Sequence, residues 1–139
     1  MWHVMIAPRY RHLLAARFAL TILGGLSAVH QFVHIGMHTM VSGGSMVRKD
    51  VPSFVKAGRD PLAFIGVNSI GLRRRGFSNE RINAIQEIYR VLYLRGHNIT
   101  QAVRYIEAHI PSTPDRDEIL SFISNSKRGL MKGYTRIKD

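Results

Sequence analysis

Aliphatic residues recur at every sixth position between residues 23 and 47, and a small or β-branched residue follows each of them four positions later. A period of six fits neither an α-helix nor a simple strand. It is typical of a hexapeptide β-helix, in which each hexad forms one side of a triangular coil. The pattern therefore predicts short parallel strands within residues 23–52. The inward positions are Leu23, Val29, Ile35, Val41 and Val47, and the paired positions are Ser27, Val33, Thr39, Ser45 and Val51.

These hexads cover less than two coils, since three hexads make one. Each coil of such a fold needs a neighbour to cover its open edge. We expect the hexads to end near Val51 and Pro52, because proline lacks the N–H that a further ladder would use. The predicted β-helix remnant spans residues 23–58. Before it, Arg11 and Arg17 occupy the inward positions, so residues 1–22 are expected to be a non-matching lead, disordered or non-native.

Helical spacing of apolar residues replaces the hexads in the second half of the chain. Ser78 is the predicted N-cap of a first helix that stops at Gly96. Thr100 is the predicted cap of a second helix, which ends before Pro111. A third helix should start near Pro114 and end with a basic pair, Lys127 and Arg128, before Gly129. The predicted segments are a connecting substrate loop at 59–77, a three-helix domain at 78–130 and a tail at 131–139.

The chain is strongly basic, with 20 Lys and Arg against 9 Asp and Glu and a formal net charge of +11. This balance indicates an anionic partner. No aromatic residues interleave the arginines and no nucleic-acid-binding motif is present, so we expect no nucleic acid as partner. The absence of cysteine excludes disulfides and thiolate chemistry. An apolar run over 13–29 is interrupted by Arg17 and overlaps the hexads, so we expect no integral membrane segment and a cytoplasmic location.

Three histidines, His30, His34 and His38, lie four residues apart. On a helix they would share one face and could hold zinc. The hexads run through this segment, so we expect the three side chains to diverge and to form no metal site. His30 follows the inward Val29 and should point outward. It is either an ordinary coil-surface residue or a group that binds or polarises a substrate in a groove against a neighbouring chain.

A run of three arginines, Arg73, Arg74 and Arg75, lies between Gly71 and Gly76. Arginine pairs with phosphate through two parallel hydrogen bonds, and flanking glycines allow close approach to a ligand. A solvated basic turn is the alternative, and the pattern alone does not decide between the two.

Three blocks of sequence resemble one enzyme family. Residues 24–32 read GGLSAVHQF, residues 66–78 read GVNSIGLRRRGFS, and residues 126–130 read SKRGL. These blocks are similar, in order and spacing, to the C-terminal part of the acyl-carrier-protein–UDP-N-acetylglucosamine O-acyltransferases. A generic hexapeptide protein would share the hexads but not the His-Gln-Phe and Arg-Arg-Gly-Phe blocks.

The resemblance implies a left-handed parallel β-helix followed by a small α-helical C-terminal domain, assembled as a cytoplasmic homotrimer. It also implies transfer of a 3-hydroxyacyl chain from acyl carrier protein to the 3-hydroxyl of UDP-N-acetylglucosamine, the first step of lipid A biosynthesis, with no cofactor. In the family, the positions of His30 and Gln31 line the substrate groove between subunits. The positions of Asn68, Arg74 and Arg75 contact the nucleotide-sugar. The basic surface would suit acyl carrier protein, which is acidic.

The chain departs from the family pattern in two respects. Family members carry more coils upstream, one of which holds the general-base histidine, and residues 1–22 do not match them. We therefore assign no catalytic residue in this chain and expect a truncated form that is inactive alone. In addition, Ile70 replaces an acidic residue of some members. Two alternatives stay open: a non-catalytic basic module that binds an anionic ligand or acidic protein, and a related UDP-sugar N-acyltransferase, against which the Arg-Arg-Gly-Phe block argues.

Overall fold

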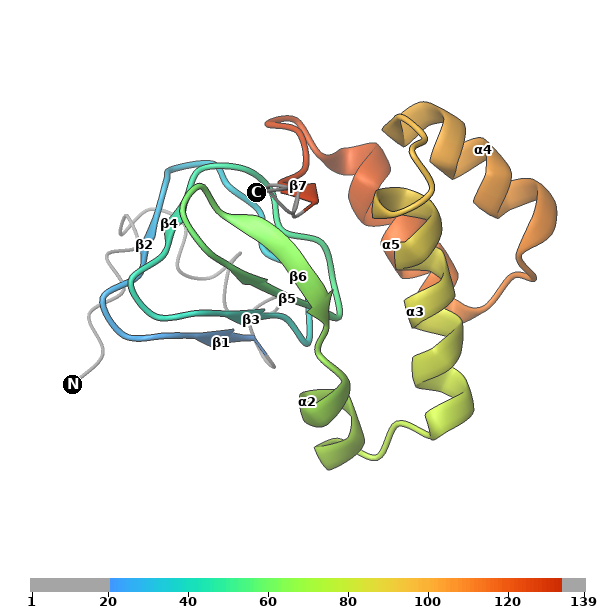
Figure 1. The fold of residues 1–139 in the computed structure, drawn as a ribbon, viewed down its shortest axis with the longest axis horizontal. Coiled ribbons are helices and arrows are strands. Elements are labelled where there is room, and N and C mark those ends of the chain that lie inside the picture. Colours follow the sequence, from blue (N-terminus) through green and yellow to red (C-terminus); the bar gives the residue numbers. More distant parts are fainter. Residues whose placement is uncertain (1–20, 134–139) are drawn as a thin grey trace, which may run out of the picture.

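Short parallel strands stack in two turns of a coil, which form the left half of Figure 1. The structure is a computed structural model and describes residues 21–133. A parallel bridge between Ile35 and Val51 supplies the third side of the coil. The strands are β1 (Ile22–Leu23), β2 (Ala28–Val29), β3 (Met40–Val41), β4 (Met46–Val47) and β5 (Val55–Gly58), with β1, β3 and β5 on one side and β2 and β4 on another.

The inward positions of the hexads form the interior of the coil, as predicted. Val41 and Val47 are fully buried, and Ile35 is buried. Leu23 and Val29 are only partly buried but pack against the same core. They belong to the first turn, which contains β1 and β2 and has a neighbouring turn on one side only within residues 21–133. Burial of the aliphatic positions is the main favourable term that holds the turns together.

The second turn is shorter than the hexads predict. Ile22 pairs with Met40, an offset of three hexads, whereas Val41 pairs with Ala57 at an offset two residues smaller. Val51 consequently lies against Ile35, an inward position. The prediction that the ladder ends near Val51 and Pro52 was therefore wrong. The backbone bends back after Pro52, and β5 continues the stack on the other side of β3 from β1.

The predicted connection at 59–77 contains two further elements. Strand β6 (Ala63–Val67) pairs with β5 in antiparallel orientation, so the parallel stack ends in a hairpin. A short helix, α2 (Ser69–Arg74), follows directly. In Figure 1, α2 projects from the lower end of β6, below the junction of the coil and the large helices.

Three larger helices follow α2 and cover one side of the coil (Figure 1). Ser78 caps the first of them, as predicted. The cap of the second was wrong: Asn98, not Thr100, accepts from the Gln101 N–H, and the Gln101 side chain accepts from the Asn98 N–H in return. Thr113 caps the third helix. The helices are α3 (Asn79–Tyr93), α4 (Ile99–His109) and α5 (Pro114–Asn125).

The third helix ends earlier than predicted, at Asn125. Ser126 is its C-cap and has an extended backbone, so Lys127 and Arg128 lie outside the helix. Arg128 instead donates from Nε to the Arg48 carbonyl at 3.4 Å, and its own carbonyl accepts from Lys49 Nζ at 2.9 Å. The basic pair therefore belongs to the segment that returns to the coil, and contact with the coil decides where the helix stops.

Helix α3 joins the helices to the coil through an aromatic stack. Phe64 of β6 stacks on Tyr89 and on Tyr93, with ring centroids 5.4 and 4.6 Å apart. The Tyr89 hydroxyl donates to the Ser53 carbonyl in the coil at 2.5 Å. Burial raises the pKa of Tyr89 well above its ordinary value, so this phenol is a hydrogen-bond donor at neutral pH. Coil and helices consequently share one continuous core.

Asp50 attaches the C-terminal segment to the coil. Its side chain is 1 % exposed and accepts from the His34 N–H at 2.8 Å and from the Ser126 hydroxyl at 2.6 Å. Its backbone pairs with residues 129–131, after which β7 (Lys132–Gly133) pairs with β6. One buried carboxylate thus connects the first turn, the second turn and the returning segment.

Asp50→Ala should lower the free energy of unfolding by about 2 kcal/mol, because it leaves the His34 N–H and the Ser126 hydroxyl without their acceptor. Ser126→Ala removes only one of the two bonds and should cost about 1 kcal/mol. Urea unfolding followed by circular dichroism measures both variants. Equal losses in the two would show that the contact with His34 contributes nothing.

No helix within residues 21–133 is long and apolar enough to cross a membrane. The lead predicted for residues 1–22 lies outside the described residues except at its end, where Ile22 already belongs to β1. The predicted tail is described only over residues 131–133.

Candidate functional site

The three arginines are presented by α2 and by the turn that follows it. Asn68 is the N-cap of this helix and its Oδ1 accepts from the Gly71 N–H at 3.3 Å. Gly71 has no side chain, and a Cβ there would lie closer than 3.0 Å to the Asn68 amide. Arg75 is the C-cap, and Gly76 leaves the helix with a φ of +87°, which glycine adopts without strain. The glycines that flank the arginines thus shape both ends of the helix.

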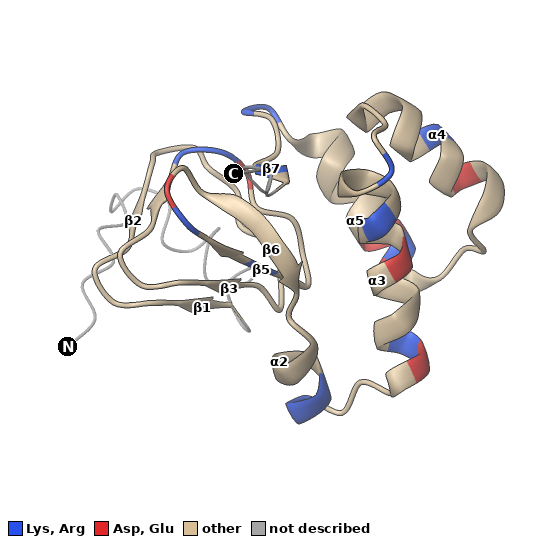
Figure 2. Ribbon diagram, in the orientation of Figure 1, with Lys and Arg blue, Asp and Glu red and all other residues tan. Residues whose placement is uncertain are grey.

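The arginine side chains differ in exposure. Arg73 and Arg74 are exposed, and Arg73 donates from Nε to Asn79 Oδ1 at 3.2 Å. Arg75 is half-buried and contacts the coil. Figure 2 shows positive charge at the C-terminal end of α2 and no acidic residue on this helix. Such a concentration of guanidinium groups attracts an anion with several oxygens, such as a phosphate or diphosphate.

The contact of Arg75 with the coil is made to His38, a residue that the sequence indicated only as a diverging coil histidine. Arg75 Nη1 lies 3.3 Å from His38 Nδ1. The imidazole is 9 % exposed and lies between Phe54, with centroids 5.7 Å apart, and Phe77, with centroids 5.1 Å apart. One regularity could have identified it: Leu26, Phe32 and His38 follow each other at six-residue intervals, and all three have positive φ, as expected of coil corners.

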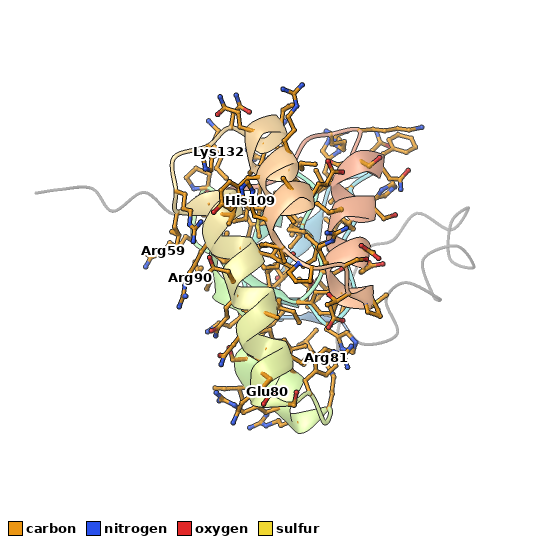
Figure 3. All side chains as sticks on the ribbon, turned by 90° about the vertical axis from the view of Figure 1, so that its right-hand side faces the viewer. Arg59, Glu80, Arg81, Arg90, His109 and Lys132 are labelled. Carbon is orange, nitrogen blue, oxygen red and sulfur yellow. The ribbon has the colours of Figure 1, made fainter. Side chains whose placement is uncertain are left out.

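The environment of His38 favours its neutral form. Burial, and then the positive charges of Arg75 and Arg81, lower the pKa of His38 below its ordinary value, while Asp115 acts in the opposite direction. Asp115 is held by Arg81 through two hydrogen bonds of 2.6 and 2.8 Å. Arg81 also lies over the Phe77 ring, with its guanidinium carbon 3.7 Å from the ring centroid. Figure 3 labels Arg81 on the side of α3 that faces α5.

The lowered pKa of His38 predicts a loss of stability in acid. The folded protein binds the proton more weakly than the unfolded chain, whose histidine titrates near 6.5. The contribution of His38 is therefore complete above pH 6.5 and is lost progressively as the pH falls below it. Urea unfolding between about pH 5 and 8 should show this decline, and the decline should be smaller in His38→Phe. An identical decline in both proteins would assign the effect to other groups.

The five residues predicted as substrate contacts fall into two groups. Asn68, Arg74 and Arg75 come together around α2, although Asn68 is only 3 % exposed and also donates from Nδ2 to the His38 carbonyl at 3.0 Å. His30 and Gln31 are exposed and directly follow β2, which lies on the side of the coil away from α2 (Figure 1). His30 Nδ1 lies 2.9 Å from the Gln31 carbonyl. A single chain thus does not bring the two groups together.

The three histidines at four-residue spacing lie in non-helical coil. His30 is exposed, His34 is half-buried and His38 is buried, and the segment from His30 to His38 contains two turns and the isolated bridge at Ile35. Within residues 21–133, no three histidine or acidic side chains come together in a way that could hold a metal ion.

Comparisons with known proteins place most of the chain in one family. The family model described as Udp N-acetylglucosamine O-acyltransferase, Domain 2, matches residues 50–131. The acyl-[acyl-carrier-protein]–UDP-N-acetylglucosamine O-acyltransferase of Leptothrix cholodnii is 44 % identical in an alignment of length 115 that covers 78 % of this chain and 44 % of that protein. The enzyme of the same name from Myxococcus xanthus is 38 % identical over 111 residues, which are 80 % of this chain and 43 % of that protein.

Solved structures agree with these matches. A UDP-N-acetylglucosamine acyltransferase from Bacteroides fragilis superposes with a TM-score of 0.79 at 42 % identity, covering 81 % of this chain and 44 % of that one. The Arabidopsis UDP-N-acetylglucosamine acyltransferase superposes with a TM-score of 0.75 at 30 % identity, covering 81 % and 42 %. The chain thus spans less than half the length of the relatives it matches. Its coil, its helices and the three sequence blocks identify it as a member of the UDP-N-acetylglucosamine O-acyltransferase family.

Proposed function

We propose that this chain serves the transfer of a 3-hydroxyacyl group from acyl carrier protein to the 3-hydroxyl of UDP-N-acetylglucosamine, in lipid A biosynthesis, by binding the nucleotide-sugar. The observation that carries the proposal is the arginine cluster on α2, which lies inside the region matched by the family model. The diphosphate of the nucleotide-sugar is the anionic group that Arg74 and Arg75 would bind. Asn68 caps the helix that carries these two arginines, and it is the third residue of the proposed nucleotide-sugar site.

The site is formed between copies of the chain. His30 and Gln31 follow β2, which lies on the side of the coil away from α2, so a single chain does not present both groups on one side. In a cyclic homotrimer of left-handed β-helices, His30 and Gln31 of one copy would lie against α2 of the next. The separation of the two groups supports this arrangement, since a heterologous contact closes into a ring when each copy offers two different surfaces.

The second substrate is acyl carrier protein, in a cytoplasmic reaction. The chain has 20 basic and 9 acidic residues, and this positive charge complements an acidic carrier protein. It would raise the rate at which the two proteins associate. The acyl chain would be carried by acyl carrier protein, so the reaction requires no resident cofactor.

A mixing experiment tests the shared site. His30→Ala and Arg74→Ala are expected to weaken binding of UDP-N-acetylglucosamine when each variant is assayed alone in calorimetry. After unfolding and refolding of an equimolar mixture, about a quarter of the sites should combine an intact His30 with an intact Arg74 and regain wild-type affinity. The control is each variant alone, unfolded and refolded in the same way. A mixture that regains no sites would place both residues in one chain's site or would exclude the trimer.

A further inference from the structure

His38 contacts both ends of α2. Its carbonyl accepts from Asn68 Nδ2 at 3.0 Å, and Asn68 is the N-cap of the helix. Its imidazole Nδ1 lies 3.3 Å from Nη1 of Arg75, the C-cap. Helix α2 has a single residue with a fully buried side chain, Leu72, so the helix buries little apolar surface against the core. His38 is therefore the coil residue that contacts both ends of α2, beside the core contact of Leu72 and the hydrogen bond from Gln86 of α3 to Ser69.

The surroundings of His38 fix the direction of its ring. Phe54 is nearly parallel to the imidazole, with an angle of 13° between the planes, and Phe77 meets it edge-on, with an angle of 71°. The backbone of His38 is in the left-handed region, with a φ of +54°, a conformation that histidine and asparagine tolerate better than most residues. The ring thus has no free rotation, and its Nδ1 is directed at Arg75.

We propose that His38 is a positioning residue, whose neutral imidazole holds Arg75 in place for the diphosphate of the nucleotide-sugar, so that protonation of His38 weakens binding. The inference rests on the proposed function, because it takes Arg75 to be a ligand contact. It adds an acid-sensitive step to binding and assigns that step to a residue which contacts no substrate.

The hydrogen-bond inventory requires the neutral form. A guanidinium has donors only, so His38 Nδ1 must accept, and its proton must lie on Nε2. Protonation would place an N–H and a second positive charge against Arg75, which removes the bond and repels the guanidinium. The other charged groups that face the ring are Arg81 from α3 and Asp115 from α5. Asp115 is engaged by Arg81 through both oxygens, and its favourable effect on a charged His38 is smaller than the opposing effects of burial, Arg75 and Arg81.

Two substitutions separate positioning from packing. His38→Phe keeps an aromatic ring between Phe54 and Phe77 but removes the acceptor. His38→Asn supplies an amide oxygen near the position of Nδ1, tolerates the positive φ and does not titrate. His109→Asn is the matched control, since His109 is an exposed histidine on α4, labelled in Figure 3, far from α2. Circular dichroism at each pH establishes that every variant is folded under the conditions of the measurement.

The experiment measures the affinity of the full chain for UDP-N-acetylglucosamine by calorimetry between about pH 5 and 8. This ligand is suitable because its diphosphate is esterified at both ends and stays ionised over the whole range. We expect wild type and His109→Asn to lose affinity about 5- to 20-fold as the pH falls below 6.5. His38→Phe should be weaker by a similar factor at every pH. His38→Asn should bind as wild type does at neutral pH and should keep that affinity in acid.

Three results would overturn the inference. Wild-type affinity in His38→Phe at neutral pH would show that Arg75 needs no positioning by His38. An unchanged acid response in His38→Asn would assign that response to another group, with His30 the first to be tested. Absence of binding by wild type at every pH would overturn the proposed function and this inference with it. In the first two cases the proposed function stands, because wild type binds.

Discussion

Arg74→Ala is expected to weaken binding of UDP-N-acetylglucosamine by about 1.5 to 3 kcal/mol, a roughly 10- to 150-fold loss of affinity. Arg74 is exposed at the C-terminal end of α2, and within the described residues its side chain is free to turn toward a ligand. An arginine–phosphate contact uses charge-assisted hydrogen bonds, which are about twice as strong as neutral ones. Calorimetric titration of the full chain with the nucleotide-sugar measures the loss directly.

Arg104→Ala is the matched control for this measurement. Arg104 is another exposed arginine, on α4, and its removal changes the net charge by the same amount. We expect it to reduce the affinity by less than about twofold, through the long-range field alone. Equal effects of the two substitutions would mean that the arginines of α2 act only through net charge. No effect of either would reduce the cluster to a solvated basic turn.

Gly36→Ala should lower the free energy of unfolding by about 3 kcal/mol. Gly36 lies where the first turn of the coil passes close to the second. A Cβ at this position would come closer than 3.0 Å to the backbone of Ser53. Backbone atoms cannot move aside as the end of a flexible side chain can, so the two turns would have to separate. Denaturant unfolding followed by circular dichroism gives the change.

Gly44→Ala provides the contrast, because the two glycines are constrained in opposite ways. Gly44 has a φ of +73°, which disfavours alanine, but nothing lies within 4 Å of its Cβ position. Its substitution should cost only about 1 kcal/mol, the usual penalty of a left-handed conformation. A loss at Gly36 no greater than at Gly44 would show that the close approach of the turns contributes little to stability.

The hexads predicted the coil because their information is local. Each aliphatic residue occupies the same place on its side of the coil, so a period of six could be read without knowledge of the neighbours. The pattern did not predict the features that depend on contacts between segments far apart in the sequence. The second turn is shortened between Val47 and Val51, and the stack continues past Pro52 into β5. The hydrophobic positions alone contain no information on the length of a corner.

The helix ends were likewise predicted correctly only where local sequence determines them. Ser78 caps α3 as predicted, whereas Asn98 and not the predicted Thr100 caps α4. Asn98 caps the helix because Gln101 lies three residues after it and completes a reciprocal pair of hydrogen bonds. The end of α5 could not be predicted from Lys127 and Arg128, because these residues follow the helix into the segment that returns to the coil.

For the candidate site, the amino-acid sequence specified the chemical groups, and the tertiary structure specified their partners. A run of arginines between glycines predicts an anion site, because the arginines supply positive charge and the glycines supply backbone freedom. Both features can be recognised within a few consecutive residues. His38 and Arg75 are 37 positions apart, and so are brought together only when α2 packs against the corner of the coil. The same packing buries Asn68 and lowers the pKa of His38, because burial and the field of neighbouring charges exist only in the folded chain.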